Sequence, residues 1–522
     1  MRSGRYSYIV VGGGAAGCVL AGRLAEHGAR VLLLEAGPTD RSPLLSIPGA
    51  SAINAANPRL NWSYQSEPQP ELCGRSLYLS QGRVLGGGSS INGMVYTRGF
   101  PQDYDAWRDA GCAGWGYQDV APYFRRSEAT LGLTRGRSSL AICERILEAT
   151  AQAGYPRAED LAGSDADGFG YYDFTISRGR RASASAAFLR PRRGAPAVAV
   201  LSNAHVAKIV IEGGRATGVV FVRNGRTETV FAEHEVVLCA GAINSPKLLM
   251  LSGIGAADPL RALGLEVAAD LPQVGENYQN HLSYKLAYAC KTPITAYRYL
   301  NPWTGALEVL RYVTDRSGFL SEGSSPMGGF FRSDDRLAQP DLQLFAPLAV
   351  VGLIGEGLRA LLPSEHGFTM FLNQGQPLSR GSVTLRAADF TVPPVVDPRY
   401  LSEPADLDAL AQGARRLREL ARQPALAEVI SREIRPGPDV ASLDEVKADI
   451  RRNAGNHFHV AGTCRMGVDP ACSVVDLQLR VHGVSGLRVA DCSIMPGLTN
   501  GNTNAPAMMI AEKAAAMILG ET

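Results

Sequence analysis

The sequence predicts an α/β protein that contains a Rossmann-like dinucleotide-binding unit and is organised as two domains, or as one large domain with insertions. Three observations lead to this fold class. Residues 6–17 place a short β-rich run directly before a glycine turn of the form G-x-G-x-x-G. Apolar and polar residues alternate over residues 201–241 as in an antiparallel meander, with turns at Gly213-Gly214 and Asn224-Gly225. The chain has 522 residues, which is too long for a single compact core.

The N-terminal unit has the order strand, turn, helix, strand. The run YSYIVV (6–11) is rich in β-branched and aromatic residues. CVLAGRLAEHG (18–28) carries apolar residues at helical spacing and ends in a glycine. RVLLLEAG (30–37) is a short apolar run typical of a buried strand. This order predicts a parallel strand pair joined by a crossover helix.

The glycines and the acid of this unit are spaced as dinucleotide binding requires. Gly12 permits the tight turn, Gly14 lets a pyrophosphate approach the backbone, and Gly17 lets the helix pack closely on the strand. Glu35 closes the second strand and can accept hydrogen bonds from ribose hydroxyls, which argues against a 2′-phosphate. We therefore expect a dinucleotide at the N-terminus of this helix.

Residues 81–99, QGRVLGGGSSINGMVYTRG, form a second glycine-rich segment. Glycines 86–88 are followed by two serines and by Asn92. Such a run can be a flexible hairpin, but this one lies among apolar residues such as Leu85 and Ile91, where loose linkers rarely occur. We expect a second backbone surface against the ligand.

These segments resemble the glucose–methanol–choline (GMC) oxidoreductase family, and the resemblance covers nearly the whole chain. GAINSPKLLMLSGIG (241–255) is similar to a second family signature. LPQVGENYQNH (271–281) is similar to a further family segment, with Asn280 where an acid is usual. The resemblance implies FAD as the cofactor. Some members tether FAD to a histidine where this chain has Ile91, so we expect noncovalent binding.

The resemblance also implies which residues bind FAD. Asn92 to Val95 would lie near the isoalloxazine ring, and Val206 would contact the adenine end. The residues expected to bind the cofactor are Gly12, Gly14, Gly17, Glu35, Ala36, Arg83, Gly88, Ser89, Asn92, Gly93, Met94, Val95, Val206, Asp491 and Thr503.

The resemblance further implies two domains assembled from separated pieces. The substrate domain would carry an antiparallel sheet with helices on one face, including a strand in GSVTLRA (381–387) and a helix at 406–421. RRGAPAVAV (192–200) looks like a segment that only joins pieces. The FAD-binding domain would comprise residues 1–158, 196–285 and 455–522, and the substrate domain residues 159–195 and 286–454.

The stretch GNHFHVAGTCRMG (455–467) places two histidines two residues apart and Cys464 five residues beyond the second. It could be a metal site, a catalytic site or a purely structural histidine pair. A zinc site usually needs three or four ligands, and no Cys or His pair elsewhere in the sequence offers an obvious fourth. We therefore expect no metal.

HVAGTCRMG matches the family pattern H-x-x-G-T-C-x-M-G, which implies His459 as the catalytic base. Asn502 falls where family members carry Asn or a second His. In an extended segment His457 shares a face with His459, so it would line the substrate pocket or alter oxygen access. Phe458 would suit a flat substrate ring, although an aromatic residue there could equally be core packing.

The C-terminal tail predicts a helix over AMMIAEKAAAMI (507–518). Pro506 suits its first turn, and Thr503 or Asn504 can cap it. The positive end of this helix would then face the ligand, where it would favour the negative charge of a reduced flavin. The alternative is an ordinary C-terminal helix.

The composition limits the partners and the compartment. A formal net charge of +2 argues against nucleic acid and against an anionic membrane surface. The N-terminal apolar run breaks into glycines, unlike a secretory signal, and an unbroken apolar stretch of about 18 residues is absent. Nine scattered cysteines without C-x-x-C suggest reduced thiols. We expect a soluble cytoplasmic protein and leave its oligomeric state open.

The function implied by the resemblance is FAD-dependent oxidation of a primary alcohol to the aldehyde. His459 would accept the hydroxyl proton, hydride would pass to flavin N5, and Asn502 would donate to the substrate oxygen. O2 or another acceptor would reoxidise the flavin. We expect a benzylic, furanic or pyridoxine-like substrate. The alternatives are a dehydrogenase of a sugar or choline-like alcohol with a non-oxygen acceptor, an FAD-containing lyase of the hydroxynitrile type, and a fatty-acid photodecarboxylase.

Overall fold

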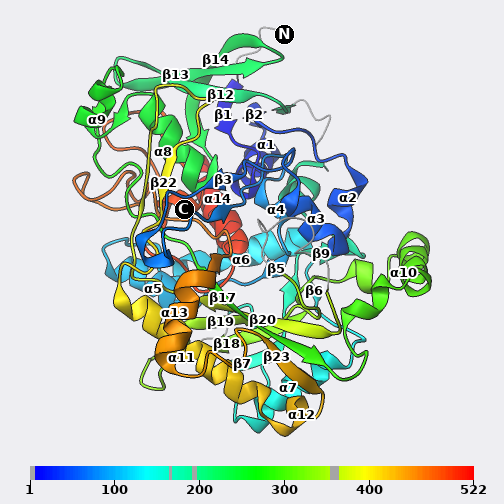
Figure 1. Cartoon of the computed structure of the whole chain (residues 1–522). Helices are drawn as coiled ribbons and strands as arrows, with labels where there is room; N and C mark the ends of the chain where they lie inside the picture. The colour runs from blue at the N-terminus through cyan, green and yellow to red at the C-terminus, as the bar shows by residue number, and fades with distance from the viewer. Residues whose placement is uncertain (1–5, 164–166, 191–196, 353–363, 522) are drawn as a thin grey trace.

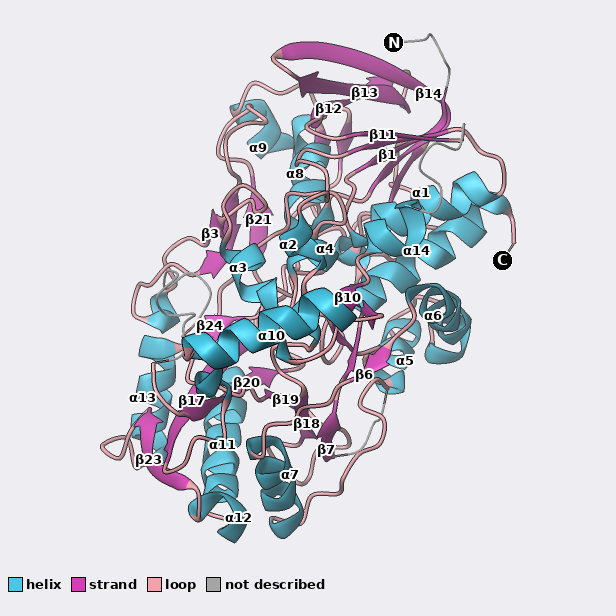
Figure 2. Ribbon diagram, turned by 90° about the vertical axis from the view of Figure 1, so that its right-hand side faces the viewer, coloured by secondary structure: helices cyan, strands magenta, loops and turns pink. Residues whose placement is uncertain are grey.

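Two sheets, each with its own hydrophobic core, organise the protein (Figure 1). The computed structural model describes residues 6–163, 167–190, 197–352 and 364–521. The first sheet lies near the N-terminus of the chain, and the second lies at the opposite end of the molecule, close to α7, α11 and α12 (Figures 1 and 2).

The first sheet has a parallel core in the order β11-β2-β1-β14, with β25 beside β14. The glycine turn joins β1 to α1, as expected from residues 6–37. All four residues of β2 and the second half of β1 are apolar and buried, and α1 packs against both strands. The elements are β1 (Tyr6–Val11), α1 (Ala15–Glu26), β2 (Val31–Leu34), β11 (Val198–Leu201), β14 (Arg226–Leu238) and β25 (Leu487–Val489).

The strand β11 corrects one sequence expectation. The segment 192–200 was expected only to join pieces, yet Val198–Leu201 pairs in parallel with Val31–Leu34 at the edge of the sheet. Residues 192–196 lie outside the described residues. An edge strand of this kind is specified by its partner strand rather than by a local pattern, which explains why the sequence did not show it.

The predicted meander is confirmed. β12 (His205–Glu212) and β13 (Arg215–Arg223) pair antiparallel, and β13 pairs with the first half of β14. Both turns place their two central residues at positive φ, between 51° and 75°, as a type I′ hairpin turn requires.

The second sheet is antiparallel, in the order β23-β17-β20-β19-β18-β7, and β24 extends it beside β17. Helices cover one of its faces (Figures 1 and 2), so the predicted helix-covered antiparallel sheet is confirmed. Its elements are β7 (Gly168–Tyr171), β17 (Leu282–Cys290), β18 (Met327–Phe331), β19 (Leu342–Phe345), β20 (Gly367–Gln374), β23 (Ile430–Arg435) and β24 (Gly455–Asn456), with α7 (Ile142–Gln152), α11 (Pro404–Ala421), α12 (Pro424–Ala427) and α13 (Leu443–Asn453).

The strand expected in 381–387 exists as β21 (Ser382–Thr384), but it does not join the second sheet. It pairs with β22 (Val395–Asp397) in a separate two-stranded sheet.

The first and last helices are joined by a buried ion pair. α14 (Asn504–Leu519) packs against α1 and α6 (Tyr117–Leu131), and Glu512 in its middle is fully buried. Arg23 of α1 donates to both carboxylate oxygens of Glu512, at 2.7 and 2.8 Å. Because a buried charge left unpaired is strongly destabilising, this pair ties the C-terminal tail to the N-terminal unit. Within the described part of the chain, no helix is both long and apolar enough to cross a bilayer.

Candidate active site

A cavity of about 1110 Å³ lies between the two sheets. Val11 and Leu34 of the first sheet line it on one side, and Phe345 and Phe371 of the second sheet line it on the other. It is larger than the pocket of a drug-sized ligand, as a dinucleotide together with a substrate requires.

The glycine turn forms the floor of the nucleotide end of this cavity. Gly12 has φ +99°, and a Cβ there would lie 2.5 Å from the Cys239 carbonyl oxygen. A Cβ on Gly17 would lie 1.9 Å from the Gly12 carbonyl oxygen, so Gly17 is needed for packing rather than for contact with a ligand. Gly14 lines the cavity, and a Cβ there would meet protein only at 3.8 Å, so its backbone is open to a ligand.

Glu35 fixes this turn against the end of β2. Its Oε2 accepts from the Gly13 backbone N–H at 2.9 Å, and its Oε1 accepts from the Gly37 N–H at 2.7 Å. Burial raises the pKa of Glu35, and the two backbone hydrogen bonds oppose that rise. Each oxygen keeps a lone pair, and the residue lines the cavity, where ribose hydroxyls can donate to it.

The helices α1, α8 (Gly241–Leu251) and α14 each begin at the cavity wall. Their N-terminal N–H groups and dipoles favour an anionic ligand. Asp491 supports the start of α8, because its Oδ2 accepts from the Gly241 N–H at 2.8 Å and from Ser245 Oγ at 2.6 Å.

The cap expected for α14 differs from the prediction in one respect. Thr503 occupies the N-cap position, but its side chain makes no capping hydrogen bond. Asn504 is the first residue of the helix rather than its cap, and its Nδ2 is buried without a partner. Asn502 Oδ1 is a second buried polar atom without a partner. Both residues line the cavity, and buried polar groups are normally satisfied, so these atoms fit a polar ligand such as a flavin.

A buried arginine that sequence reasoning missed, Arg181, donates hydrogen bonds to the second glycine-rich segment. Arg181 is 5% exposed, and its Nη1 donates to Asn92 Oδ1 at 2.7 Å and to the Ser89 carbonyl oxygen at 3.2 Å. Asn92 Oδ1 also accepts from the Met94 N–H at 3.1 Å. Burial lowers the pKa of Arg181 to about 9.

The structure brings nearly all predicted cofactor and substrate residues to one cavity. Two do not line it: Gly17, for the packing reason given above, and Arg83, whose guanidinium lies over the Trp62 ring at 4.9 Å. The predicted residues that line the cavity are Gly12, Gly14, Glu35, Ala36, Gly88, Ser89, Asn92, Gly93, Met94, Val95, Val206, His457, Phe458, His459, Asp491, Asn502 and Thr503.

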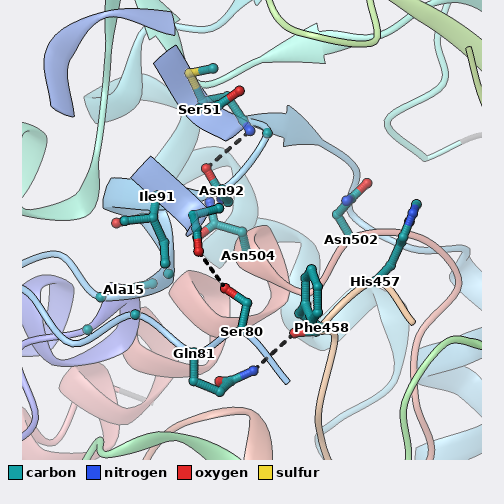
Figure 3. Close-up of a pocket in the computed structure, with 18 of the residues that line it drawn as sticks. Ala15, Ser51, Ser80, Gln81, Ile91, Asn92, His457, Phe458, Asn502 and Asn504 are labelled. Atoms are coloured by element: carbon teal, nitrogen blue, oxygen red, sulfur yellow. Dashed lines mark hydrogen bonds between the residues drawn. The ribbon is translucent and has the colours of Figure 1, made fainter. Parts of the chain in front are cut away.

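His459 stands at the other end of the cavity. Its backbone N–H donates to Asn280 Oδ1 at 2.8 Å, which places the loop after β24. Its Nε2 lies 3.1 Å from Asn502 Nδ2. Figure 3 shows Asn502, His457 and Phe458 together on one side of the pocket, with Ala15 and Ile91 on the other.

A second histidine, His281, determines where the proton of His459 sits. His281 is fully buried, and its Nε2 lies 2.8 Å from the Gly375 carbonyl oxygen, which can only accept. The single proton of a neutral His281 is therefore on Nε2, and its Nδ1 must accept. His459 Nδ1 lies 2.8 Å from that Nδ1, so His459 donates from Nδ1. Its Nε2 then presents a lone pair, to which the Asn502 amide donates.

Burial keeps these histidines neutral. It lowers the pKa of His281 to about 4, although the carbonyls of Gly375 and Thr499 oppose that fall. It also lowers the pKa of His459 well below its usual value, and the neighbouring His281 and His457 lower it further. At neutral pH His459 is consequently neutral, and its Nε2 can accept a proton once a substrate hydroxyl takes the place of the Asn502 N–H.

His457 lies beside this group but has a different partner. Its Nδ1 is 2.6 Å from Asn373 Nδ2, and its ring packs between those of Phe345 and Phe371, with centroids 5.2 and 5.5 Å away. Burial lowers the pKa of His457 to about 3. Among the described residues, no group of three or more His, Cys, Asp or Glu side chains is placed to hold a metal ion.

Sequence reasoning missed the supporting residues His281, Asn373 and Arg181, and it noted Asn280 without giving it a role at the site. His281 and Asn280 end the family-like segment 271–281, so a signal for them was present. Asn280, which stands where an acid is usual, holds the His459 backbone through its Oδ1. Asn373 and Arg181 lie in stretches without any chemical motif.

Two family models, both described as GMC oxidoreductase, match residues 6–283 and 377–511. The chain belongs to the GMC oxidoreductase family. As a member of this family it is an FAD-dependent oxidoreductase that acts on CH–OH donors.

Relatives and solved structures agree with this assignment over nearly the whole chain. The human mitochondrial choline dehydrogenase is 41% identical over 541 residues, which cover 99% of this chain and 90% of the relative. The oxygen-dependent choline dehydrogenase of Sinorhizobium fredii is 41% identical, with coverage of 98% and 95%. Pyridoxine 4-oxidase from Mesorbium loti superimposes with a TM-score of 0.87 at 30% identity, covering 99% of each chain. Aspergillus oryzae formate oxidase superimposes with a TM-score of 0.93 at 25% identity, covering 100% and 99%.

The arrangement around His281 predicts how its substitution affects the reaction. His281→Leu removes the acceptor for His459 Nδ1–H, so the proton is no longer confined to Nδ1. We expect the rate of flavin reduction by an alcohol substrate to fall at least about tenfold. His281→Asn can keep an acceptor oxygen near the position of Nδ1 and should retain most of the rate. Stopped-flow absorbance of the bound flavin measures both variants.

The absorbance spectrum of bound FAD and the thermal midpoint serve as controls for folding of the two variants. Equal rates in His281→Leu and the wild-type protein would show that His281 does not set the proton position of His459.

Proposed function

We propose that the protein oxidises a neutral primary alcohol with a flat, mostly apolar body to its aldehyde, with His459 as the proton acceptor. The observation that carries the proposal is the hydrogen-bond series that leaves a lone pair on His459 Nε2 inside the cavity. Bound FAD supplies the hydride acceptor for such a reaction.

His459 and Asn502 have different roles toward the alcohol group. His459 Nε2 accepts the hydroxyl proton. Because His459 Nε2 has a single lone pair, the hydroxyl takes the place of the Asn502 N–H that Nε2 otherwise accepts, and the Nδ2 N–H groups can then donate to the alcohol oxygen. The Asn502 backbone is held in turn, because its N–H donates to Thr97 Oγ1 at 2.8 Å. This holds the alcohol in one orientation at the base.

The walls beside His459 favour a flat substrate. Phe345, Phe371 and Phe458 line the cavity together with His457. Aromatic rings pack favourably on aromatic and heteroaromatic rings in stacked or edge-to-face arrangements. The 30% identity to a pyridoxine 4-oxidase supports the same substrate class.

A second candidate is a choline-like alcohol, favoured by the choline dehydrogenases among the relatives. Aromatic walls can also hold a quaternary ammonium group. However, the carboxylates that line the described cavity make no hydrogen bond with His457, Phe458 or His459. Glu35, Asp491 and Glu308 are engaged by backbone and side-chain donors elsewhere, whereas Glu322 also lines the cavity and burial raises its pKa to about 7. At neutral pH Glu322 is therefore only partly ionised, and it offers a cationic substrate a weaker counter-charge than a fully ionised carboxylate does.

Anaerobic mixing of the holoenzyme with alcohols tests the proposal. We expect a benzylic, furanic or pyridoxine-like alcohol to bleach the yellow flavin faster than choline or a sugar alcohol does. Rapid return of the colour when O2 is admitted marks an oxidase, and slow return marks a dehydrogenase with another acceptor. A flavin that stays yellow with every alcohol would contradict alcohol oxidation and favour a lyase.

Substitution of the two neighbouring histidines separates their roles. His459→Ala removes the proton acceptor and should slow flavin reduction by about two to four orders of magnitude while FAD stays bound. His457→Phe keeps a ring between Phe345 and Phe371 and should mainly change KM and the order of preferred alcohols. Steady-state kinetics over the alcohol panel measure both effects. A His457→Phe variant as slow as His459→Ala would show that the roles are misassigned.

Noncovalent binding of FAD has a direct test. The buried Ile91 stands in the segment where some relatives of this family carry a tethering histidine, and it lines the cavity. Acid precipitation should release all of the flavin into the supernatant, measured by absorbance. Yellow colour that stays in the washed pellet would contradict noncovalent binding.

A further inference from the structure

The helix α10 (Pro302–Asp315) presents an apolar face to solvent. Trp303, Leu307, Leu310 and Val313 are 82%, 55%, 57% and 63% exposed. Their spacing of four, three and three residues places them in one stripe along the helix. Solvent-facing stripes of soluble proteins are normally polar, so this stripe marks a surface that contacts something apolar.

The orientation of α10 is fixed by polar contacts on its inner side. Glu308 is buried, and its Oε2 accepts from the Phe319 backbone N–H at 2.7 Å. The buried Tyr312 hydroxyl donates to the Ser46 carbonyl oxygen at 3.4 Å. The helix also has a formed N-terminus, because Asn301 Oδ1 accepts from the Trp303 N–H at 3.0 Å. The apolar stripe is therefore held outward by the fold. Figure 1 shows α10 at the right-hand edge of the molecule, and Figure 2 shows it in front, on the face turned toward the viewer.

The same surface continues to the mouth of the cavity. Ile53, Leu300 and Val309 are 56%, 49% and 53% exposed, and all three line the cavity. The rim on this side of the cavity is thus apolar, and it adjoins the stripe of α10.

Cationic side chains lie at both ends of the helix. The Arg298 guanidinium lies 5.8 Å from the centre of the Tyr299 ring just before α10, and that of Arg316 lies 4.9 Å from the Tyr312 ring at its C-cap. An apolar stripe with a tryptophan, flanked by arginines, is typical of helices that lie in the interface of a lipid bilayer.

The size of the stripe argues against a stable dimer. The four partly exposed side chains of the stripe offer on the order of 400 Å², and the three rim residues Ile53, Leu300 and Val309 add a smaller area, whereas a standard protein–protein interface buries about 800 Å² on each partner. A bilayer has no such lower limit, because insertion is favoured in proportion to the apolar area buried.

We propose that α10 lays its outer face into the surface of a lipid bilayer, with the apolar rim of the cavity facing the membrane. The bilayer then adjoins the route into the cavity, and an apolar ligand dissolved in the lipid can enter without crossing water. The net charge of +2 led us to expect no membrane contact, but this contact depends on local apolar area rather than on overall charge.

Flotation of the FAD-loaded protein with phosphatidylcholine vesicles tests the proposal. We expect the wild-type protein to float with the vesicles, and the addition of phosphatidylglycerol to strengthen binding through Arg298 and Arg316. Leu307→Gln combined with Leu310→Gln should weaken partitioning at least about tenfold. Neither leucine lines the cavity, so FAD absorbance should be unchanged.

Matched controls distinguish α10 from other exposed apolar residues. Phe231 and Val468 are 52% and 68% exposed elsewhere on the surface, and the Phe231→Gln, Val468→Gln double variant should float like the wild type. Tryptophan fluorescence provides a second readout, because Trp107 and Trp115 are buried and Trp303 is the most exposed of the four tryptophans. Vesicles should shift the emission to shorter wavelength, and Trp303→Phe should abolish the shift while the protein still floats.

Three outcomes would overturn the proposal. The wild-type protein could fail to float with either vesicle. The α10 variant and the control variant could bind vesicles equally well. Sedimentation could instead reveal a dimer that the α10 substitutions abolish, which would assign the stripe to a second copy of the chain. All of these tests are independent of alcohol oxidation.

Discussion

A backbone carbonyl oxygen can only accept a hydrogen bond. The Gly375 carbonyl therefore fixes the proton of His281 on Nε2, and the unprotonated Nδ1 of His281 in turn fixes the proton of His459 on its Nδ1. The position of the carbonyl depends on the second sheet. β17 and β20 pair with Ser283 opposite Asn373, and His281 and Gly375 each lie two residues beyond that pair. The same strand end supplies Asn373 to His457. One strand pairing therefore organises both histidines of the cavity, and the lone pair on His459 Nε2 follows from the register of the sheet.

The opposite wall of the cavity, at the glycine turn, depends on two positions where only glycine fits. Gly12 and Gly17 leave no room for a Cβ, so the chain turns closely enough for the starts of α1 and α8 to face one ligand. The two walls come from distant parts of the sequence, and the buried pair of Arg23 with Glu512 ties the C-terminal tail to the N-terminal unit. Because the tail carries Asn502 and Thr503, this ion pair also helps to place the amide beside His459.

The sequence predicted those features that depend on local chemistry. The glycine turn, the meander turns and the stretch around His459 each need particular residue types at fixed spacing, so they are visible without a structure. The roles of His281, Asn373 and Arg181 depend on which segments meet in space, and the strand Val198–Leu201 depends on a partner in β2. For the stripe of α10, a local pattern alone would have given the wrong answer. Its apolar spacing would normally indicate a face packed on the core, whereas the buried Glu308 and Tyr312 turn it outward.

The proton position on His459 is the central claim, and nitrogen-15 NMR of the histidine-labelled holoenzyme tests it most directly, with a His459→Gln variant to assign the signals. We predict a neutral ring with its proton on Nδ1 and an unprotonated Nε2 at neutral pH. Because burial lowers the pKa of His459, this form should persist as the pH falls below about 6.5, the usual value for histidine. An Nε2-protonated ring, or an imidazolium at neutral pH, would contradict the account.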